Sequence, residues 1–279
     1  MLAAALPAAD AEEIAETIGR AATHALVLEV ETWPKPGLVS HVDAGAHDDM
    51  DAALLCASAR TVQPWFVALA QAGAAGAEMG RLRAIGIAAE ADMRRTTGGV
   101  NTHRGAIFGM GLLTAAAGFR ARYRTGKPLG TIVAQRWGAA ILHDAPEPHS
   151  HGSTVARRHG AGGARAEAAA GMPSLYNSAL PALVEGRRLA PDDPEAARVH
   201  ACMALIAAVE DSNLLYRGGT AGLAFAQAEA RAFLSAGGVG AADWRLRAEQ
   251  IHRRFVARRL SPGGCADLLA MALFVDAMQ

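Results

Sequence analysis

Apolar residues recur three and four positions apart over most of this chain, which predicts an all-α protein with helix following helix. Alternation with a period of two, typical of strands, never persists beyond four residues. The glycine motifs of Rossmann and P-loop nucleotide sites are also absent, so both folds are disfavoured. The segments predicted to be helical are 10–32, 49–72, 81–95, 104–118, 129–144, 164–171, 192–216, 220–236, 242–259 and 265–277.

The interruptions between these segments indicate the organisation of the chain. Trp33-Pro-Lys-Pro-Gly37 ends the first helix, because proline cannot continue one. The longest irregular stretch is 145–163, and a loop of that length in a compact domain is usually functional or disordered. Within 192–216, the run Ala201–Val209 is apolar almost all round and is predicted to be buried. No repeat or linker divides the chain, so we predict one catalytic domain over residues 1–279.

Composition narrows the class of protein. Lysine plus arginine and aspartate plus glutamate both number 27, and this zero net charge argues against a nucleic-acid-binding protein. Cys56, Cys202 and Cys265 are too far apart for a zinc knuckle or a disulfide scaffold, which fits a reducing cytoplasm. The first residues lack a signal-peptide pattern, and the longest apolar run is too short to cross a bilayer. We therefore expect a soluble cytoplasmic protein without a membrane partner, and the composition leaves a homo-oligomer open.

Four polar islands interrupt the helical pattern, and the first spans residues 29–51. Two prolines hold Lys35 in an extended segment, where its ammonium can meet a phosphate, and Ser40 follows closely. Acidic and imidazole groups then gather near a helix start: Asp43, His47, Asp48 and Asp51. His47 and Asp51 are one turn apart and can share a ligand. Alternatively, first-turn carboxylates here only complement the helix dipole.

The second island is the loop Thr96–Arg104, with Glu90 in the helix before it. Its two glycines let the backbone approach a ligand closely. The free N–H groups at the start of the next helix suit a phosphate. A glycine C-cap followed by Thr102 as an N-cap is the structural alternative, but it leaves Asn101, His103 and Arg104 unexplained.

The third island spans 150–167 and interleaves Arg157, Arg158 and Arg165 with glycines before Glu167. Forked guanidinium donors beside an approachable backbone are suited to polyphosphate, although a solvated basic loop is the alternative. The fourth island spans 210–219. Asp211 ends the buried run and needs a cation or hydrogen-bond donors there. Either Mg²⁺ held by Asp211 and Asn213 or an ion pair with Arg217 would supply this.

The segment Ser261-Pro-Gly-Gly-Cys-Ala-Asp267 is a weaker signal. A Pro-Gly-Gly turn before a helix is ordinary. Asp267 falls in the first turn of that helix, where complementing the helix dipole is the default interpretation.

The islands, in this order, resemble the triphosphoribosyl-dephospho-CoA synthase family over roughly residues 24–275. The similar segments are Pro34–Ser40, Asp43–Met50, Thr97–Phe108, Ser150–Gly152, Gly163–Glu167, Asp211–Asn213, Arg217–Gly219 and Ser261–Ala270. One such segment is a weak signal, whereas the ordered set is a strong one. Departures are mild, since Arg104 stands where lysine is common and Ser212 where threonine is common.

The resemblance implies transfer of the 5-triphosphoribosyl group of ATP to the ribose 2′-hydroxyl of 3′-dephospho-CoA, with adenine released. The product would be the prosthetic-group precursor of an acyl carrier protein, passed on to a carrier-modifying enzyme. Residues 156–165 look more like the branch that serves malonate decarboxylase than the one that serves citrate lyase.

This chemistry needs carboxylates near a developing oxocarbenium carbon, a group that takes the hydroxyl proton, and cations for the triphosphate. The predicted catalytic groups are His103, Glu167 and Glu90. The predicted substrate-binding residues are Lys35, Ser40, Asn101, Thr102, Arg104, Arg157, Arg158, Arg165 and Arg217. The predicted Mg²⁺ ligands are Asp43, His47, Asp48, Asp211 and Asn213. A metal-dependent glycosyl hydrolase and a non-catalytic nucleotide-binding protein are the alternative hypotheses.

Overall fold

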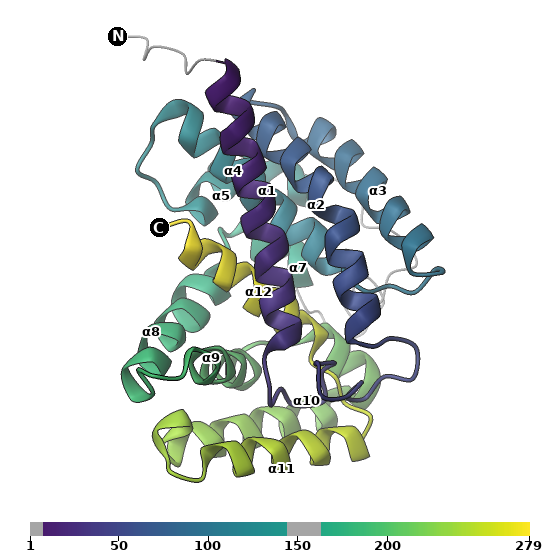
Figure 1. The fold of residues 1–279 in the computed structure, drawn as a ribbon, viewed down its shortest axis with the longest axis vertical. Helices are drawn as coiled ribbons and strands as arrows, with labels where there is room; N and C mark the ends of the chain where they lie inside the picture. The colour runs from purple at the N-terminus through teal and green to yellow at the C-terminus, as the bar shows by residue number, and fades with distance from the viewer. Residues whose placement is uncertain (1–7, 144–162) are drawn as a thin grey trace.

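Helices account for the regular structure of this chain, as the sequence predicted. The computed structural model describes residues 8–143 and 163–279, and in these ranges there is no strand (Figure 1). The first five helices are α1 (Ala8–Glu31), α2 (Ala52–Ala74), α3 (Met79–Thr96), α4 (Arg104–Tyr123) and α5 (Leu129–His143). The later elements are α7 (Gly163–Ala169), a π-helical turn (Leu175–Ala179), α8 (Leu180–Leu189), α9 (Pro194–Ala208), α10 (Ser212–Ser235), a 3₁₀ turn (Gly238–Gly240), α11 (Trp244–Ala257) and α12 (Gly263–Ala277).

One predicted helix is wrong: residues 192–216 are not continuous. Helix α9 ends at Ala208, and the chain is extended at Val209 before α10 starts at Ser212. The side chain of Asp211 accepts hydrogen bonds from the N–H groups of Asn213 and Leu214, so it begins a new helix. The predicted break near 217–219 is found at Gly219, where φ of 61° and ψ of −163° kink α10.

The π-helical turn and α8 occupy residues 175–189, for which the sequence pattern predicted no element. Pro181 stands in the first turn of α8, a position where the missing N–H costs nothing. Their short lengths gave too few turns for a clear periodic signal. They pack against α9 and the 3₁₀ turn, so tertiary contacts supply the stability that local periodicity does not show.

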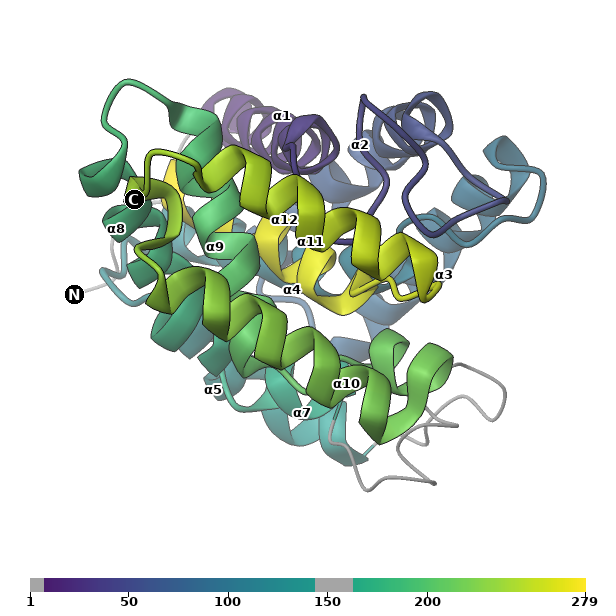
Figure 2. The same cartoon turned by 90° about the horizontal axis from the view of Figure 1, so that it is seen from below.

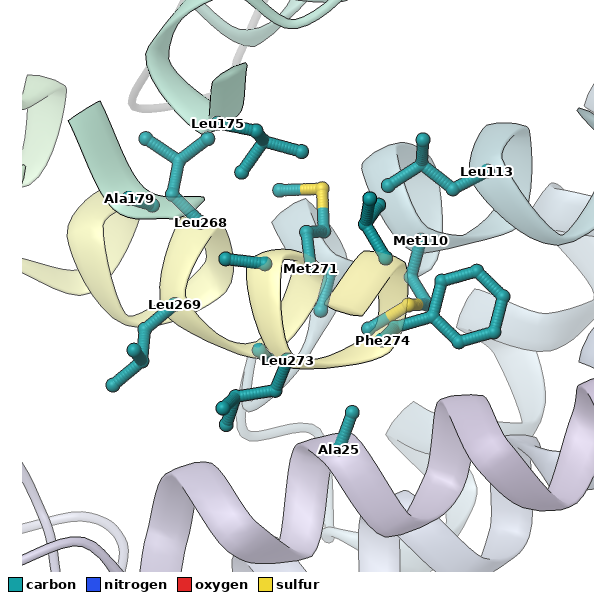
Figure 3. Packing of buried hydrophobic residues seen from close by; sticks show 14 of the residues in the cluster. Ala25, Met110, Leu113, Leu175, Ala179, Leu268, Leu269, Met271, Leu273 and Phe274 are labelled. Carbon is teal, nitrogen blue, oxygen red and sulfur yellow. The ribbon is translucent and has the colours of Figure 1, made fainter. Parts of the chain in front are cut away.

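Helix α12 is the innermost helix of the bundle. Every residue from Leu268 to Val275 is buried, because this helix is apolar on all its faces. Figure 3 shows Met271 and Phe274 of α12 beside Met110 of α4. On its other side, α12 meets Leu175 of the π-helical turn. One hydrophobic cluster takes residues from all the described helices.

Small residues let α2 and α4 cross at close range. A Cβ atom on Gly118 of α4 would lie 1.9 Å from the carbonyl oxygen of Ala70 on α2. Gly73 of α2 meets Ala115 of α4 in the same way, also at 1.9 Å. Neither position has room for a side chain, which explains how an alanine-rich sequence builds a dense core from few aromatic residues.

Helix α2 is also the one described helix that is long and apolar enough to cross a membrane by length and composition. It packs against α1, α3 and α4 (Figure 1). Its apolar face therefore has partners inside the bundle.

Candidate functional site

Lys35 is buried and paired with an acid of its own chain. Its side chain is 0 % exposed, and Nζ donates to the carbonyl oxygen of Glu29 at 2.5 Å and to the Glu29 carboxylate. Burial raises the pKa of Glu29, and the Lys35 charge opposes that shift. Lys35 does lie in the loop after α1, but its ammonium faces the end of α1 rather than the surface.

The loop after α1 is fastened to α11. The ring of His252, which is buried, lies 2.6 Å from the carbonyl oxygen of Lys35 and 3.2 Å from a carboxylate oxygen of Asp43. Gly37 has φ of 67°, and a Cβ atom there would lie 2.0 Å from the carbonyl oxygen of Leu260. Only glycine fits this approach. Through these contacts, His252 positions the loop.

His47 joins the first and fourth islands and the segment that starts at Ser261. Its Nε2 lies 2.9 Å from the hydroxyl of Ser261, and its Nδ1 lies 3.1 Å from Asp49. Arg217 of α10 reaches the same ring at 3.4 Å and donates to the carbonyl oxygen of Ala46 at 3.1 Å. Burial lowers the pKa of His47, and the Arg217 charge adds to that effect. Figure 2 shows the α1–α2 loop beside the junction of α11 and α12, where these contacts form.

His103 lies inside the protein at the start of α4. It is 5 % exposed, and its Nδ1 lies 2.8 Å from the hydroxyl of Ser58 on α2. That hydroxyl also lies 2.7 Å from the hydroxyl of Thr102. Burial, helped by the charge of Lys35, lowers the pKa of His103 to about 4. The imidazole is therefore neutral at neutral pH.

This neutral His103 predicts a loss of stability in acid. The unfolded chain takes up a proton near pH 6.5, whereas the folded protein resists it down to about pH 4. The unfolded state binds more protons in that window, so the free energy of unfolding falls as pH drops through it, by about 3 kcal/mol. This contribution is complete above pH 6.5 and lost below about pH 4.

Urea denaturation at a series of pH values measures this slope. His103→Asn removes the imidazole and should flatten the slope, whereas His24→Asn, which changes an exposed imidazole, should leave it unchanged. The partly buried ring of His47 and the buried ring of His200 also have lowered pKa values and act in the same direction, so the flattening will be partial. A His103→Asn slope equal to that of the parent protein would contradict the assignment.

Asp211 connects the first turns of two helices. One carboxylate oxygen accepts from the N–H groups of Asn213 at 2.7 Å and Leu214 at 3.0 Å. The other accepts from the N–H of Cys265 in α12 at 2.8 Å. The side chain is 1 % exposed, and burial raises its pKa against these three donors. The sequence predicted that a buried Asp211 needs a cation or hydrogen-bond donors, and the donors found are backbone N–H groups. An ion pair with Arg217 is not among the described contacts of Asp211.

Asp267 of α12 lies at the start of α4, a contact that its default interpretation as a partner of the helix dipole did not predict. It is half-buried and accepts a hydrogen bond from the N–H of Ala106. A Cβ atom on Gly105 would lie 2.0 Å from its carboxylate oxygen, so only glycine permits this approach. Burial and the negative charges of Glu29 and Asp211 raise the pKa of Asp267 well above its ordinary value.

These groups form one region, which we call the buried polar cluster. It consists of Glu29, Lys35, Ser58, His103, Asp211 and Asp267. Their mutual effects on pKa show that the groups lie within electrostatic reach, although α1, α2, α4, α10 and α12 or adjoining loops supply them. One lysine lies among three acids there, and carboxylates in such a group, when ionised, stabilise a substrate atom that becomes positive as it reacts.

Other predicted residues of the second island lie around this cluster. Glu90 pairs with Arg94 at 3.0 Å and with Arg104 at 3.3 Å. Asn101 is exposed and accepts from the N–H of Arg104 at 3.3 Å. Gly98 has φ of 63°, and a Cβ atom there would meet nothing within 4 Å. The glycine serves the backbone conformation, and the surface of the loop is open.

The third island is described only in part. Arg157 and Arg158 lie outside the described residues, as does Ser150-His-Gly152. Arg165 donates to the carbonyl oxygen of Leu142 at 3.3 Å and also to that of Ile141, at the end of α5. Glu167 accepts from the N–H of Ser174 at 2.6 Å. In these contacts, both side chains connect α7 with neighbouring segments.

The predicted Mg²⁺ ligands do not come together as one set. Asp48 is 85 % exposed and lies 3.5 Å from Arg259, whereas Asp211 is committed to two helix starts. Ser40, a predicted substrate residue near Asp43, accepts from the N–H of Val42 at 3.1 Å and stabilises the loop. Within residues 8–143 and 163–279, no group of three or more His, Cys, Asp or Glu side chains is placed to hold a metal. These residues do not fit a protein-built metal cage.

Sequence reasoning gave no role to Glu29 and Ser58 and undervalued Asp267. Glu29 precedes Lys35 by six positions, with Pro34 between them. That short spacing between an acid and a lysine was the one signal in the sequence for their pairing. Asp267 follows a Pro-Gly-Gly turn, a common helix start. Its neighbour Gly105 lies in a different island, so only the fold reveals the contact.

Comparison with known proteins gives a consistent result. The family model described as ATP:dephospho-CoA triphosphoribosyl transferase matches residues 15–279. A protein of Stutzerimonas stutzeri is 40 % identical over 280 residues, which cover 98 % of this chain and 95 % of that protein. Similar proteins of Pseudomonas aeruginosa (strain UCBPP-PA14) and Azotobacter vinelandii are 42 % and 38 % identical, each over 95 % of this chain and over 91 % and 92 % of their own. All three are named probable 2-(5''-triphosphoribosyl)-3'-dephosphocoenzyme-A synthase. No solved structure matches this chain.

Proposed function

This chain belongs to the ATP:dephospho-CoA triphosphoribosyl transferase family, and from that premise we propose that it makes the prosthetic-group precursor for a malonate decarboxylase. The enzyme is a triphosphoribosyl-dephospho-CoA synthase, which confirms the resemblance found in the sequence. It joins the triphosphoribosyl group of ATP to dephospho-CoA. The narrower role rests on residues 156–165, whose arginine and glycine pattern resembles the malonate decarboxylase branch.

The observation that supports this activity best is the buried polar cluster at the start of α4 and α12. Breaking the bond between adenine and ribose leaves positive charge on the ribose carbon, and the acids of the cluster would stabilise it. Arg104 and Arg217 lie at the edge, in contact with Glu90 and His47, where they can take the phosphates of a substrate. Neutral His103 serves in this proposal as a hydrogen-bonding group.

Magnesium enters this proposal with the substrate. The described residues offer no cage of three protein ligands, and Mg²⁺ commonly binds through one or two carboxylates together with substrate phosphates. We therefore treat the ion as part of the ATP complex and assign no step of the reaction to it. The cytoplasm, the carrier-modifying enzyme that takes the product, and a homo-oligomer remain predictions from the sequence.

The test is incubation of the purified protein with ATP, Mg²⁺ and dephospho-CoA, followed by mass analysis. We expect adenine and the coupled product in equal amounts. Free triphosphoribose formed without dephospho-CoA would identify a hydrolase instead. Nucleotide binding with no adenine released would identify a binding protein and would refute the transferase assignment for this chain.

The malonate decarboxylase role needs a separate experiment in the source organism. Deletion of this gene should leave the acyl carrier protein of malonate decarboxylase without its prosthetic group, as measured by the mass of the carrier. A malonate decarboxylase carrier that keeps its full mass, with an unmodified citrate lyase carrier, would assign the enzyme to the other branch.

A further inference from the structure

The three acids of the buried polar cluster differ in what they have left to offer a substrate. Glu29 is paired with Lys35, and burial keeps both away from solvent. Asp211 uses both oxygens for backbone N–H groups of α10 and α12. Removing either acid from its partners would leave buried polar groups unpaired, which is costly. Both therefore have structural tasks that a changing protonation state would disturb.

Asp267 has no comparable structural task. The described residues give its carboxylate one hydrogen bond, from the N–H of Ala106, and no ion pair. Unlike Asp211, it is only half-buried, so part of it is reachable from outside. Gly105 allows one carboxylate oxygen to lie directly against the backbone of α4, beside the Thr-His-Arg loop of the second island. This is an acid held in place and left with free acceptor capacity.

The surroundings of Asp267 also make it a strong base for a carboxylate. Two further acids, Glu29 and Asp211, raise its pKa, and burial adds the largest effect. A general base works best when its pKa lies near the working pH. Two of the catalytic groups predicted from the sequence are less suitable as a base, because the pKa of His103 is about 4 and Glu167 accepts a hydrogen bond from the N–H of Ser174.

We propose that Asp267 is the catalytic base that takes the proton from the attacking 2′-hydroxyl of dephospho-CoA. This inference rests on the proposed function. The hydroxyl oxygen forms a bond to C1 of the ribose of ATP as the C1–N9 bond breaks. The electron pair of that bond leaves on adenine. The hydroxyl proton goes to the Asp267 carboxylate and is later passed through solvent to adenine, so atoms and charge balance.

Variants of Asp267 and Gly105 test this role. Asp267→Asn keeps an oxygen for the N–H of Ala106 and should fold, yet its kcat should fall at least about 10²-fold. Gly105→Ala keeps the acid but places a methyl group 2.0 Å from its carboxylate oxygen, so it should lose activity as well. The matched control is Asp276→Asn, which alters an acid at the far end of α12 that pairs with Arg187 and should retain full turnover.

Two readouts separate a base from a merely structural acid. The acidic limb of the kcat profile against pH should disappear in Asp267→Asn, and added formate should restore part of the turnover of Asp267→Ala. Parent-like turnover by Asp267→Asn overturns this inference, while adenine release by the parent protein still supports the transferase. Reduced turnover of Asp267→Asn with the acidic limb kept, together with an Asp267→Ala variant that formate does not rescue, overturns it too. No adenine from the parent protein overturns both proposals.

Discussion

Replacing Lys35 by methionine should lower the free energy of unfolding by about 3–5 kcal/mol, because it leaves the carboxylate of Glu29 buried without its cation. Methionine retains the length and much of the apolar stem of lysine, so the loss reports the missing charge rather than a large cavity. Burial already raises the pKa of Glu29, and removing Lys35 removes the effect that opposes this. The penalty should therefore shrink at low pH, where Glu29 becomes protonated.

The chain provides matched controls for this result. Its other lysine, Lys127, is exposed and donates to Gln135, so Lys127→Met should change stability by less than about 0.5 kcal/mol. The double variant Lys35→Met/Glu29→Gln removes both charges and should recover much of the loss. Urea denaturation measures all three. If Lys35→Met were as stable as the parent protein at pH 8, the buried pair would have to be abandoned.

Asp211→Ala should cost about 3–5 kcal/mol, since three backbone N–H groups, two of them buried, lose their acceptor at once. Two of these groups belong to the first turn of α10 and the third to α12, so both helix starts are affected. The stability of Asp211→Asn should lie between that of the parent protein and that of Asp211→Ala. The amide of asparagine keeps one oxygen that accepts hydrogen bonds, but its NH₂ group replaces the other acceptor with a donor. Activity should fall together with stability, as α12 also positions Asp267.

Asp51→Ala is the matched control for Asp211, because Asp51 caps only α2 and is exposed. Its loss should cost about 1 kcal/mol, the usual value for one N-cap. Thermal denaturation followed by circular dichroism compares the two. Equal losses for Asp51→Ala and Asp211→Ala would mean that Asp211 contributes as a single cap and does not connect two helices.

Local information in the sequence was enough to identify the fold class and the polar islands. The three- and four-residue spacing of apolar positions made most helices evident, and proline and glycine marked where α1 and α3 end. The same spacing joined α9 to α10, because alanine-rich turns continue smoothly until Asp211. Capping by one side chain outweighed that periodicity, an effect that residue spacing alone does not reveal.

The candidate site was predicted in its parts and not in its pairings. Residue types in the islands indicated a site for phosphates and a reacting sugar, and His47, His103, Asp211 and Arg217 were among them. Their roles shifted on folding: Lys35 met an acid instead of solvent, and His103 became a buried neutral ring. The metal set dispersed, because exposed Asp48 and buried Asp211 occupy different environments.

The sequence by itself determined that this protein is helical, because helix formation depends on neighbours three and four positions away. It also determined which chemical groups the loops present. Only the tertiary structure decided which of them meet: Cys265 reaches Asp211 from 54 positions away, and Asp267 meets Gly105 of a different helix. Helix packing brings these groups together, and burial away from water then sets their charge and hydrogen bonding. The spacing of residues along the chain predicts neither the pairing nor the burial.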